Sequence, residues 1–124
     1  MKHETRVCIA YIAGRLITKS RPRFVFDQLQ SRHLIVKGKV RQTGVYVHDF
    51  SRNCYVTGDG KKGSFTLYDQ GERCHVSLKI EFEEKKFSGY DNGTRSHFSG
   101  KVEDVTVKFF DYADNRLFSF RLDK

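Results

Sequence analysis

The chain of 124 residues has no Trp, one Pro and three Cys, and these shortages exclude several classes of protein. Three Cys are too few for a disulfide-stapled domain, and their odd number favours a reducing compartment, so we expect a cytoplasmic protein. No apolar run approaches the roughly 20 residues of a membrane-spanning helix, so we expect no membrane partner. An apolar fraction of 38% is too high for a disordered chain. The length predicts one soluble domain, residues 1–124.

Five segments of the chain repeat one pattern around an Asp residue. Each alternates apolar and polar residues on both sides of a short polar break, which is typical of a β-hairpin. The Asp residues are spaced 22, 20, 22 and 20 residues apart, a regularity that indicates an internal repeat. The predicted hairpins are approximately residues 23–37, 45–59, 65–79, 87–101 and 107–121.

The pairing within each hairpin follows if the Asp faces the residue five positions later. Leu67 then faces Val76 on the inner side, and the missing side chain of Gly89 faces the bulky Phe98. Each Asp lies at a strand end, where its carboxylate can accept hydrogen bonds from the N–H groups of the turn. We therefore expect five structural turn caps: Asp27, Asp49, Asp69, Asp91 and Asp111.

Short links between the hairpins predict an all-β fold, an antiparallel up-and-down meander of about ten strands. The apolar stretch VCIAYIAGRLI, residues 7–17, is interpreted as an additional N-terminal strand or part of a hairpin. A sheet of this size exposes edges unless it curls, so we expect a closed or nearly closed barrel. A two-sheet sandwich is the alternative.

Residues 87–101, FSGYDNGTRSHFSGK, contain Asp, His and Ser, but strand parity argues against a catalytic set. His97 and Ser99 share one face of the sheet and Asp91 lies on the other, so the hydrogen bonds of a triad cannot form. The equivalent His residues of successive hairpins stand two strands apart, roughly 10 Å, which is too far to share a zinc ion. We expect no catalytic residue, no metal and no cofactor.

The outer face carries a row of aromatic and imidazole side chains next to the Asp residues. In the expected register, the residue before each Asp faces the residue six positions after that Asp. Such cross-strand pairs stabilise a sheet by about 0.2–1 kcal/mol each, and so large an exposed row also suits a binding surface or self-association into a homo-oligomer. The predicted aromatic belt is Phe26, His33, His48, Tyr55, Tyr68, His75, Tyr90, His97 and Phe110, with Leu117 facing Phe110.

Positive charge is concentrated in one half of the chain. Residues 1–62 contain 13 Lys and Arg against 4 Asp and Glu, whereas residues 63–124 contain 10 against 11. Such an excess attracts anionic partners, either nucleic acid or an acidic protein, although it also serves solubility. The predicted anion-binding patch is Lys19, Arg21, Arg23, Lys37, Lys39, Arg41, Lys61 and Lys62.

These patterns favour a non-catalytic binding or assembly module that uses the aromatic belt and the basic N-terminal half. One alternative is a carrier that encloses a small apolar ligand, because the inward-facing residues are almost all apolar. A lesser alternative is an enzyme with a His and Tyr acid–base pair, at His75 with Tyr68 or at His97 with Tyr90.

Overall fold

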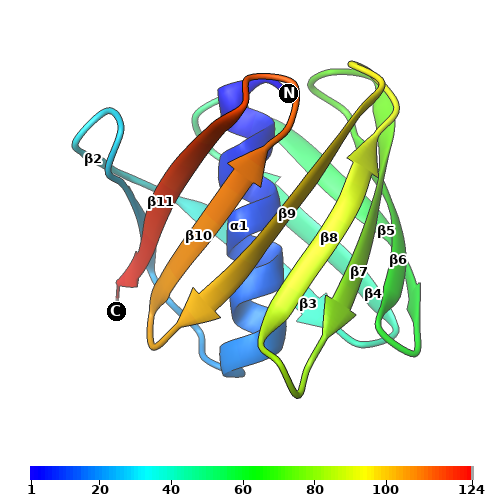
Figure 1. Ribbon diagram of the computed structural model, residues 1–124, viewed down its shortest axis with the longest axis horizontal. Coiled ribbons are helices and arrows are strands. Elements are labelled where there is room, and N and C mark those ends of the chain that lie inside the picture. Colours follow the sequence, from blue (N-terminus) through cyan, green and yellow to red (C-terminus); the bar gives the residue numbers. More distant parts are fainter. Residues whose placement is uncertain (124) are drawn as a thin grey trace.

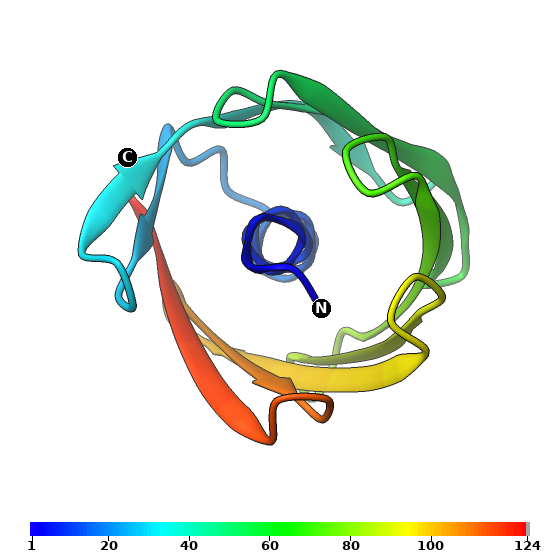
Figure 2. The ribbon, with the colours of Figure 1, turned by 90° about the horizontal axis from the view of Figure 1, so that it is seen from above.

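A computed structural model describes residues 1–123 as a barrel of antiparallel strands around a single helix (Figures 1 and 2). Seen from above, the helix runs down the centre of the ring of strands (Figure 2). The elements in chain order are helix α1 (His3–Thr18) and strands β1 (Phe24–Asp27), β2 (Arg32–Leu34), β3 (Val36–Arg41), β4 (Gly44–Asp49), β5 (Cys54–Lys61), β6 (Ser64–Asp69), β7 (Cys74–Glu81), β8 (Lys86–Asp91), β9 (Ser96–Glu103), β10 (Thr106–Asp111) and β11 (Arg116–Asp123).

The eleven strands form one sheet in the order β2-β1-β11-β10-β9-β8-β7-β6-β5-β4-β3, so the predicted antiparallel meander is confirmed. β2 and β3 follow one another directly, separated only by Ile35, and this bent segment nearly closes the barrel. β2 pairs with β1, whereas β3 pairs with β4. Over residues 1–123, no pairing joins β3 to β1 or to residues 19–23, and we call this interruption in the wall the seam.

The predicted register within the hairpins is also confirmed. Leu67 faces Val76, and Gly89 faces Phe98. The five Asp residues all lie at the same end of the barrel, the upper end in Figure 1, which we call the Asp rim. The fourth residue after each Asp adopts a left-handed backbone with φ between 51° and 54°, so all five turns share one construction: Ser31, Asn53, Arg73, Arg95 and Asn115.

The interpretation of residues 7–17 as a strand is wrong, because this stretch forms most of α1. Every residue from Thr5 to Gly14 is buried, so this part of the helix is enclosed by the barrel wall. A helix buried all round needs apolar residues in every direction and shows no amphipathic stripe. A short continuous apolar run of this kind is compatible with either a buried strand or a buried helix.

The helix fills the space that the carrier alternative assigned to a ligand. Ile9 and Ile12 of α1 have no exposed surface, and neither has Phe109 of the surrounding wall. The rings of Phe98 and Phe109 stack with their centroids 5.1 Å apart. The inward-facing residues of the strands therefore form a packed core with the helix at its centre.

Candidate functional site

The five carboxylates of the Asp rim are buried and hold the hairpin turns. None is more than 3% exposed. In each turn, one carboxylate oxygen accepts a hydrogen bond from the backbone N–H two residues later, the geometry expected of an Asx turn. The bonds are Leu29 N–H to Asp27 (2.9 Å), Ser51 to Asp49 (3.0 Å), Gly71 to Asp69 (2.9 Å), Gly93 to Asp91 (2.9 Å) and Ala113 to Asp111 (3.0 Å).

The same carboxylates also bind the N-terminal half of α1, a role that sequence reasoning missed. The helix donors are Thr5, Arg6 and Cys8, and His3 shares a hydrogen bond with Asp27. Negative charge at a helix N-terminus is favoured by the helix dipole. The bonds to Thr5, Arg6 and Cys8 are Thr5 Oγ1 to Asp69 (2.6 Å), Arg6 Nη1 to Asp111 (2.7 Å) and Cys8 Sγ to Asp49 (3.6 Å).

Arg52 connects two carboxylates of the rim to each other. Its Nε donates to Asp49 at 2.7 Å and its Nη1 donates to Asp69 at 3.1 Å. The nearby thiol of Cys8 is fully buried, and this burial, together with the charge of Asp49, raises its pKa well above the usual value. The cluster is therefore a structural network that seats the helix, because its side chains are enclosed and engaged with one another.

The aromatic belt forms with the predicted partners. The rings of Phe26 and His33, His48 and Tyr55, Tyr68 and His75, and Tyr90 and His97 pack with centroids 4.7–4.9 Å apart. Phe110 faces Leu117 across the last hairpin, as expected, and its ring contacts Tyr112 at 4.8 Å. The belt surrounds the barrel just below the Asp rim, so its members do not converge on one point.

The residues considered for catalysis lie apart or pack only ring against ring. Asp91 faces inward and accepts hydrogen bonds from Gly93 and Thr94, while His97 lies on the outer face against Tyr90. The Tyr68–His75 and Tyr90–His97 rings meet edge to face at 60° and 66°. This geometry is that of aromatic packing.

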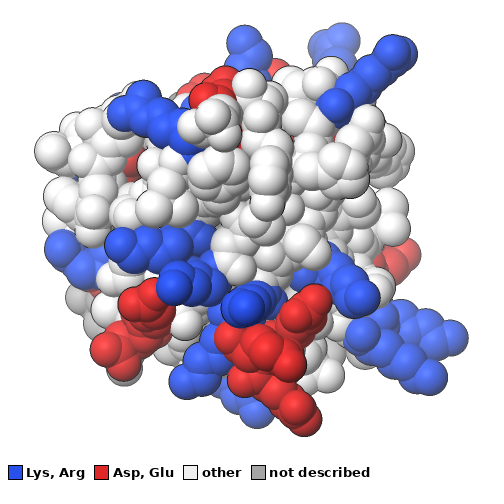
Figure 3. Space-filling model, viewed as in Figure 1, with Lys and Arg blue, Asp and Glu red and all other residues white. Residues whose placement is uncertain are grey.

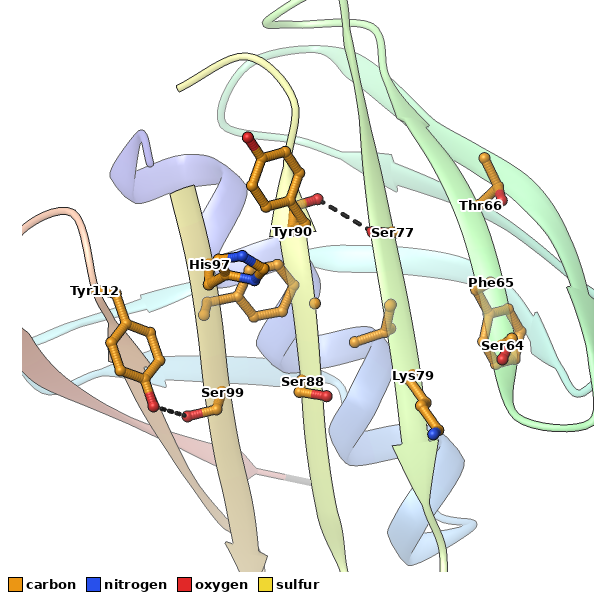
Figure 4. Close-up of a pocket in the computed structure, with 13 residues that line it drawn as sticks. Ser64, Phe65, Thr66, Ser77, Lys79, Ser88, Tyr90, His97, Ser99 and Tyr112 are labelled. Carbon is orange, nitrogen blue, oxygen red and sulfur yellow. Dashed lines mark hydrogen bonds between the residues drawn. The ribbon is translucent and has the colours of Figure 1, made fainter. Parts of the chain in front are cut away.

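An open hollow of about 760 Å³ lies on the outer wall over β6–β9 (Figure 4). Tyr90, His97 and Tyr112 border it, and the phenol of Tyr112 lies 3.2 Å from Ser99 Oγ. The face of the molecule in Figure 3 carries few charges in the band between the turns above and the charged side chains of its lower half. The hydroxyl residues of the hollow are Ser64, Thr66, Ser77, Ser88 and Ser99.

A groove of about 650 Å³ lies at the seam, where the wall of the barrel is not closed by strand pairing. Its three sides are the C-terminal turn of α1, residues 19–23 and β3. Among the residues that the structure describes, no Asp or Glu lines it. We call it the basic groove, after the seven cationic residues that line it: Arg15, Lys19, Arg21, Arg23, Lys37, Lys39 and Arg41.

The basic groove contains six of the eight residues of the predicted anion-binding patch. Lys61 and Lys62 lie elsewhere, at the turn between β5 and β6. Arg15 was missed because residues 7–17 were interpreted as strand, which gave no reason to place its side chain beside β3. The sequence signal that could have found it is the cationic residue at the end of an apolar run, since cations favour helix C-termini.

Arg15 is held in place at the groove by two hydrogen bonds. Its Nη1 donates to the phenol oxygen of Tyr11 at 3.1 Å and to the backbone carbonyl of Gly38 at 2.8 Å. The helix ends at Thr18 and is capped by Lys19, whose N–H donates to the Arg15 carbonyl and whose φ is 57°. The negative end of the helix dipole amounts to about half a charge, which is far less than seven cations require for balance.

The described part of the chain holds neither a metal-binding cluster nor a membrane-spanning helix. Across residues 1–123, no three His, Cys, Asp or Glu side chains are grouped so that they could hold a metal ion. In the same range, no helix combines the length and apolar character needed to cross a bilayer. Comparison of the chain with protein-family models, curated proteins and solved structures gave no match.

Proposed function

We propose that the protein is a non-catalytic binding module and that its basic groove holds an anionic ligand. The observation that carries this proposal is the convergence of seven cationic side chains on one groove to which residues 1–123 contribute no Asp or Glu side chain. Like charges gathered in one place repel one another and attract counter-ions. Cations needed only for solubility serve equally well when dispersed, so their concentration supports a binding role.

The protection of an exposed strand edge explains only part of this charge. Lys residues on an edge discourage pairing with other chains, and Lys37 and Lys39 of β3 suit that purpose. Arg15 does not, because it comes from the helix and its guanidinium already bonds to the edge through the Gly38 carbonyl. Lys19, Arg21 and Arg23 lie outside any strand, so edge protection does not explain their charges either.

Charge reversal on β3 tests the proposal. In the variant Lys37→Glu, Lys39→Glu, Arg41→Glu, the salt concentration that elutes the protein from an immobilised anionic polymer should fall sharply. The control reverses three exposed cations away from the groove, Lys61→Glu, Lys62→Glu and Lys86→Glu, with the same change in net charge. Equal losses of retention in the two variants would show that net charge, and not the groove, causes binding.

Self-association through the aromatic belt is a second candidate function. It is supported by Leu117 and Tyr112, which lie on either side of Phe110 of the belt and are 53% and 56% exposed although both are large and apolar in character. Exposed apolar clusters of this kind are typical of contact surfaces. Replacing both with Ser should lower the molecular mass measured by sedimentation equilibrium if the hairpin joins two copies. A wild-type protein that is monomeric at high micromolar concentration would overturn this candidate.

A further inference from the structure

We infer that the ligand of the basic groove is a compact polyphosphate anion that carries no aromatic base. This inference rests on the proposed function, because it names the chemical class that the same groove would take. It depends on three features: the shape of the groove, the geometry of its donors and the character of its remaining lining residues.

The groove gathers its cations around a limited volume. Its walls come from three separate elements, α1, residues 19–23 and β3, and it measures about 650 Å³. Sites for small molecules fall within about 300–1,000 Å³. A nucleic-acid backbone instead requires cations along an extended track. The other two cations of the predicted patch, Lys61 and Lys62, lie at the turn between β5 and β6 and do not line the groove, so the groove favours a compact multivalent anion.

The donors of the groove suit phosphate groups. Four of its seven cations are Arg, whose planar guanidinium can give two parallel N–H bonds to one phosphate. Arg15 is already oriented by Tyr11 and Gly38 before any ligand arrives. Pre-orientation reduces the conformational entropy that binding would otherwise cost. Arg15 is therefore expected to contact the ligand at the inner end of the groove.

The other lining residues offer no surface on which a base could stack. Within residues 1–123, Tyr11 is the one aromatic residue of the lining, and it is only 2% exposed. Its phenol also accepts the hydrogen bond from Arg15. Proteins that bind single-stranded nucleic acid without sequence preference combine a basic groove with aromatic rings on which the bases stack. This lining favours phosphates carried on a small non-aromatic scaffold, or linked directly to one another.

Calorimetric titration with inorganic tripolyphosphate at fixed ionic strength tests the inference. Wild type should bind one tripolyphosphate per chain, and ATP should not bind more tightly, because its base adds no contact. The variant Lys37→Ser, Lys39→Ser should bind at least tenfold more weakly. The control Lys61→Ser, Lys62→Ser, with the same loss of charge, should change the affinity less than twofold.

The remaining outcomes separate this inference from the proposed function. A 20-nucleotide oligo-dT that binds through the groove, in the absence of any saturable tripolyphosphate binding, would overturn the inference and leave an anion-binding groove. If the groove variant and its control weakened the binding of tripolyphosphate and of oligo-dT equally, the inference and the proposed function would both be overturned. Circular dichroism of each variant verifies that the barrel is folded. The variant Arg15→Lys keeps the charge but loses the planar guanidinium, so it should weaken tripolyphosphate binding.

Discussion

Thr5 Oγ1 donates a 2.6 Å hydrogen bond to Asp69 Oδ2, which joins the buried helix to the middle hairpin of the barrel wall. The two residues are 64 positions apart in the chain. Asp69 uses its other oxygen to hold its own turn through the N–H of Gly71. One carboxylate thus shapes the hairpin and positions the helix, and the same double use recurs around the Asp rim at Asp111 and Asp27.

Removing the Thr5 hydroxyl should destabilise the protein without changing its shape. In Thr5→Val, the buried carboxylate of Asp69 loses one donor but keeps Arg52 and the turn N–H. A hydrogen bond to a charged group contributes about 1.5–3 kcal/mol, so we expect the free energy of unfolding in urea to fall by about that amount. Thr66→Val, at an exposed position of β6, is the control and should change stability little. Equal stabilities of the two variants would contradict a structural role for the bond.

The close contact at Gly89 gives a second prediction. A side chain there would overlap the Ser77 carbonyl oxygen and the Phe98 ring, which fills the space that glycine leaves. Gly89→Ala should therefore lower the free energy of unfolding by about 1–3 kcal/mol, the usual range for overpacking. Ser88→Ala, one residue away and facing outward, should change stability by less than about 0.5 kcal/mol. A neutral Gly89→Ala would show that β7 and β9 can move apart.

The three thiols should react slowly in the folded protein. Burial, reinforced by Asp91, raises the pKa of Cys74 to about 11 from the ordinary 9.0, and burial also raises the pKa values of Cys8 and Cys54. Because the thiolate is the nucleophile, Cys74 at pH 8 should have about 100-fold less of the reactive form than an ordinary thiol. Its rate of alkylation should rise roughly tenfold per pH unit, since the thiolate fraction does so below the pKa.

Alkylation followed by mass spectrometry distinguishes the thiols and tests the position of the helix. Cys8 has no exposed surface, so its labelling should require unfolding, and the chain in 8 M urea provides the reference rate. Rapid labelling of Cys8 in the native protein would contradict a helix enclosed by the barrel.

The hairpins were predictable from the sequence because the same alternation of apolar and polar residues recurs around an Asp in each of them. Strand parity fixes which residues face inward, and the complementary sizes of Gly89 and Phe98 identify the register without further data. The aromatic pairs followed from the same register, since Tyr68 must face His75 once Asp69 is placed at the turn.

The helix was not predictable by the same means. Because the barrel buries this helix all round from Thr5 to Gly14, it lacks the polar face that marks an ordinary amphipathic helix. Only the surrounding sheet explains why residues 7–14 can be buried on every side. Part of the basic groove was predictable, because the excess of positive charge along the chain pointed to Lys37 and Lys39. Arg15 was not predictable, because only the position of the helix end brings its side chain beside β3.

The concentration of charge in the basic groove should also affect stability in the absence of a ligand. Removing two cations, by Lys37→Ser and Lys39→Ser, relieves repulsion among the seven, and like-charge pairs typically destabilise by about 0.2–0.5 kcal/mol each. The melting temperature at low salt should therefore rise by about 1–3 °C relative to wild type, a sign opposite to that of most substitutions. At about 1 M NaCl the Debye length is only about 3 Å, so the difference should largely disappear.

The control variant Lys61→Ser, Lys62→Ser, which lies outside the groove, should give a smaller rise in melting temperature. A fall in melting temperature for the groove variant at low salt would mean that these cations stabilise the folded protein, and the excess of positive charge would then need no ligand to explain it.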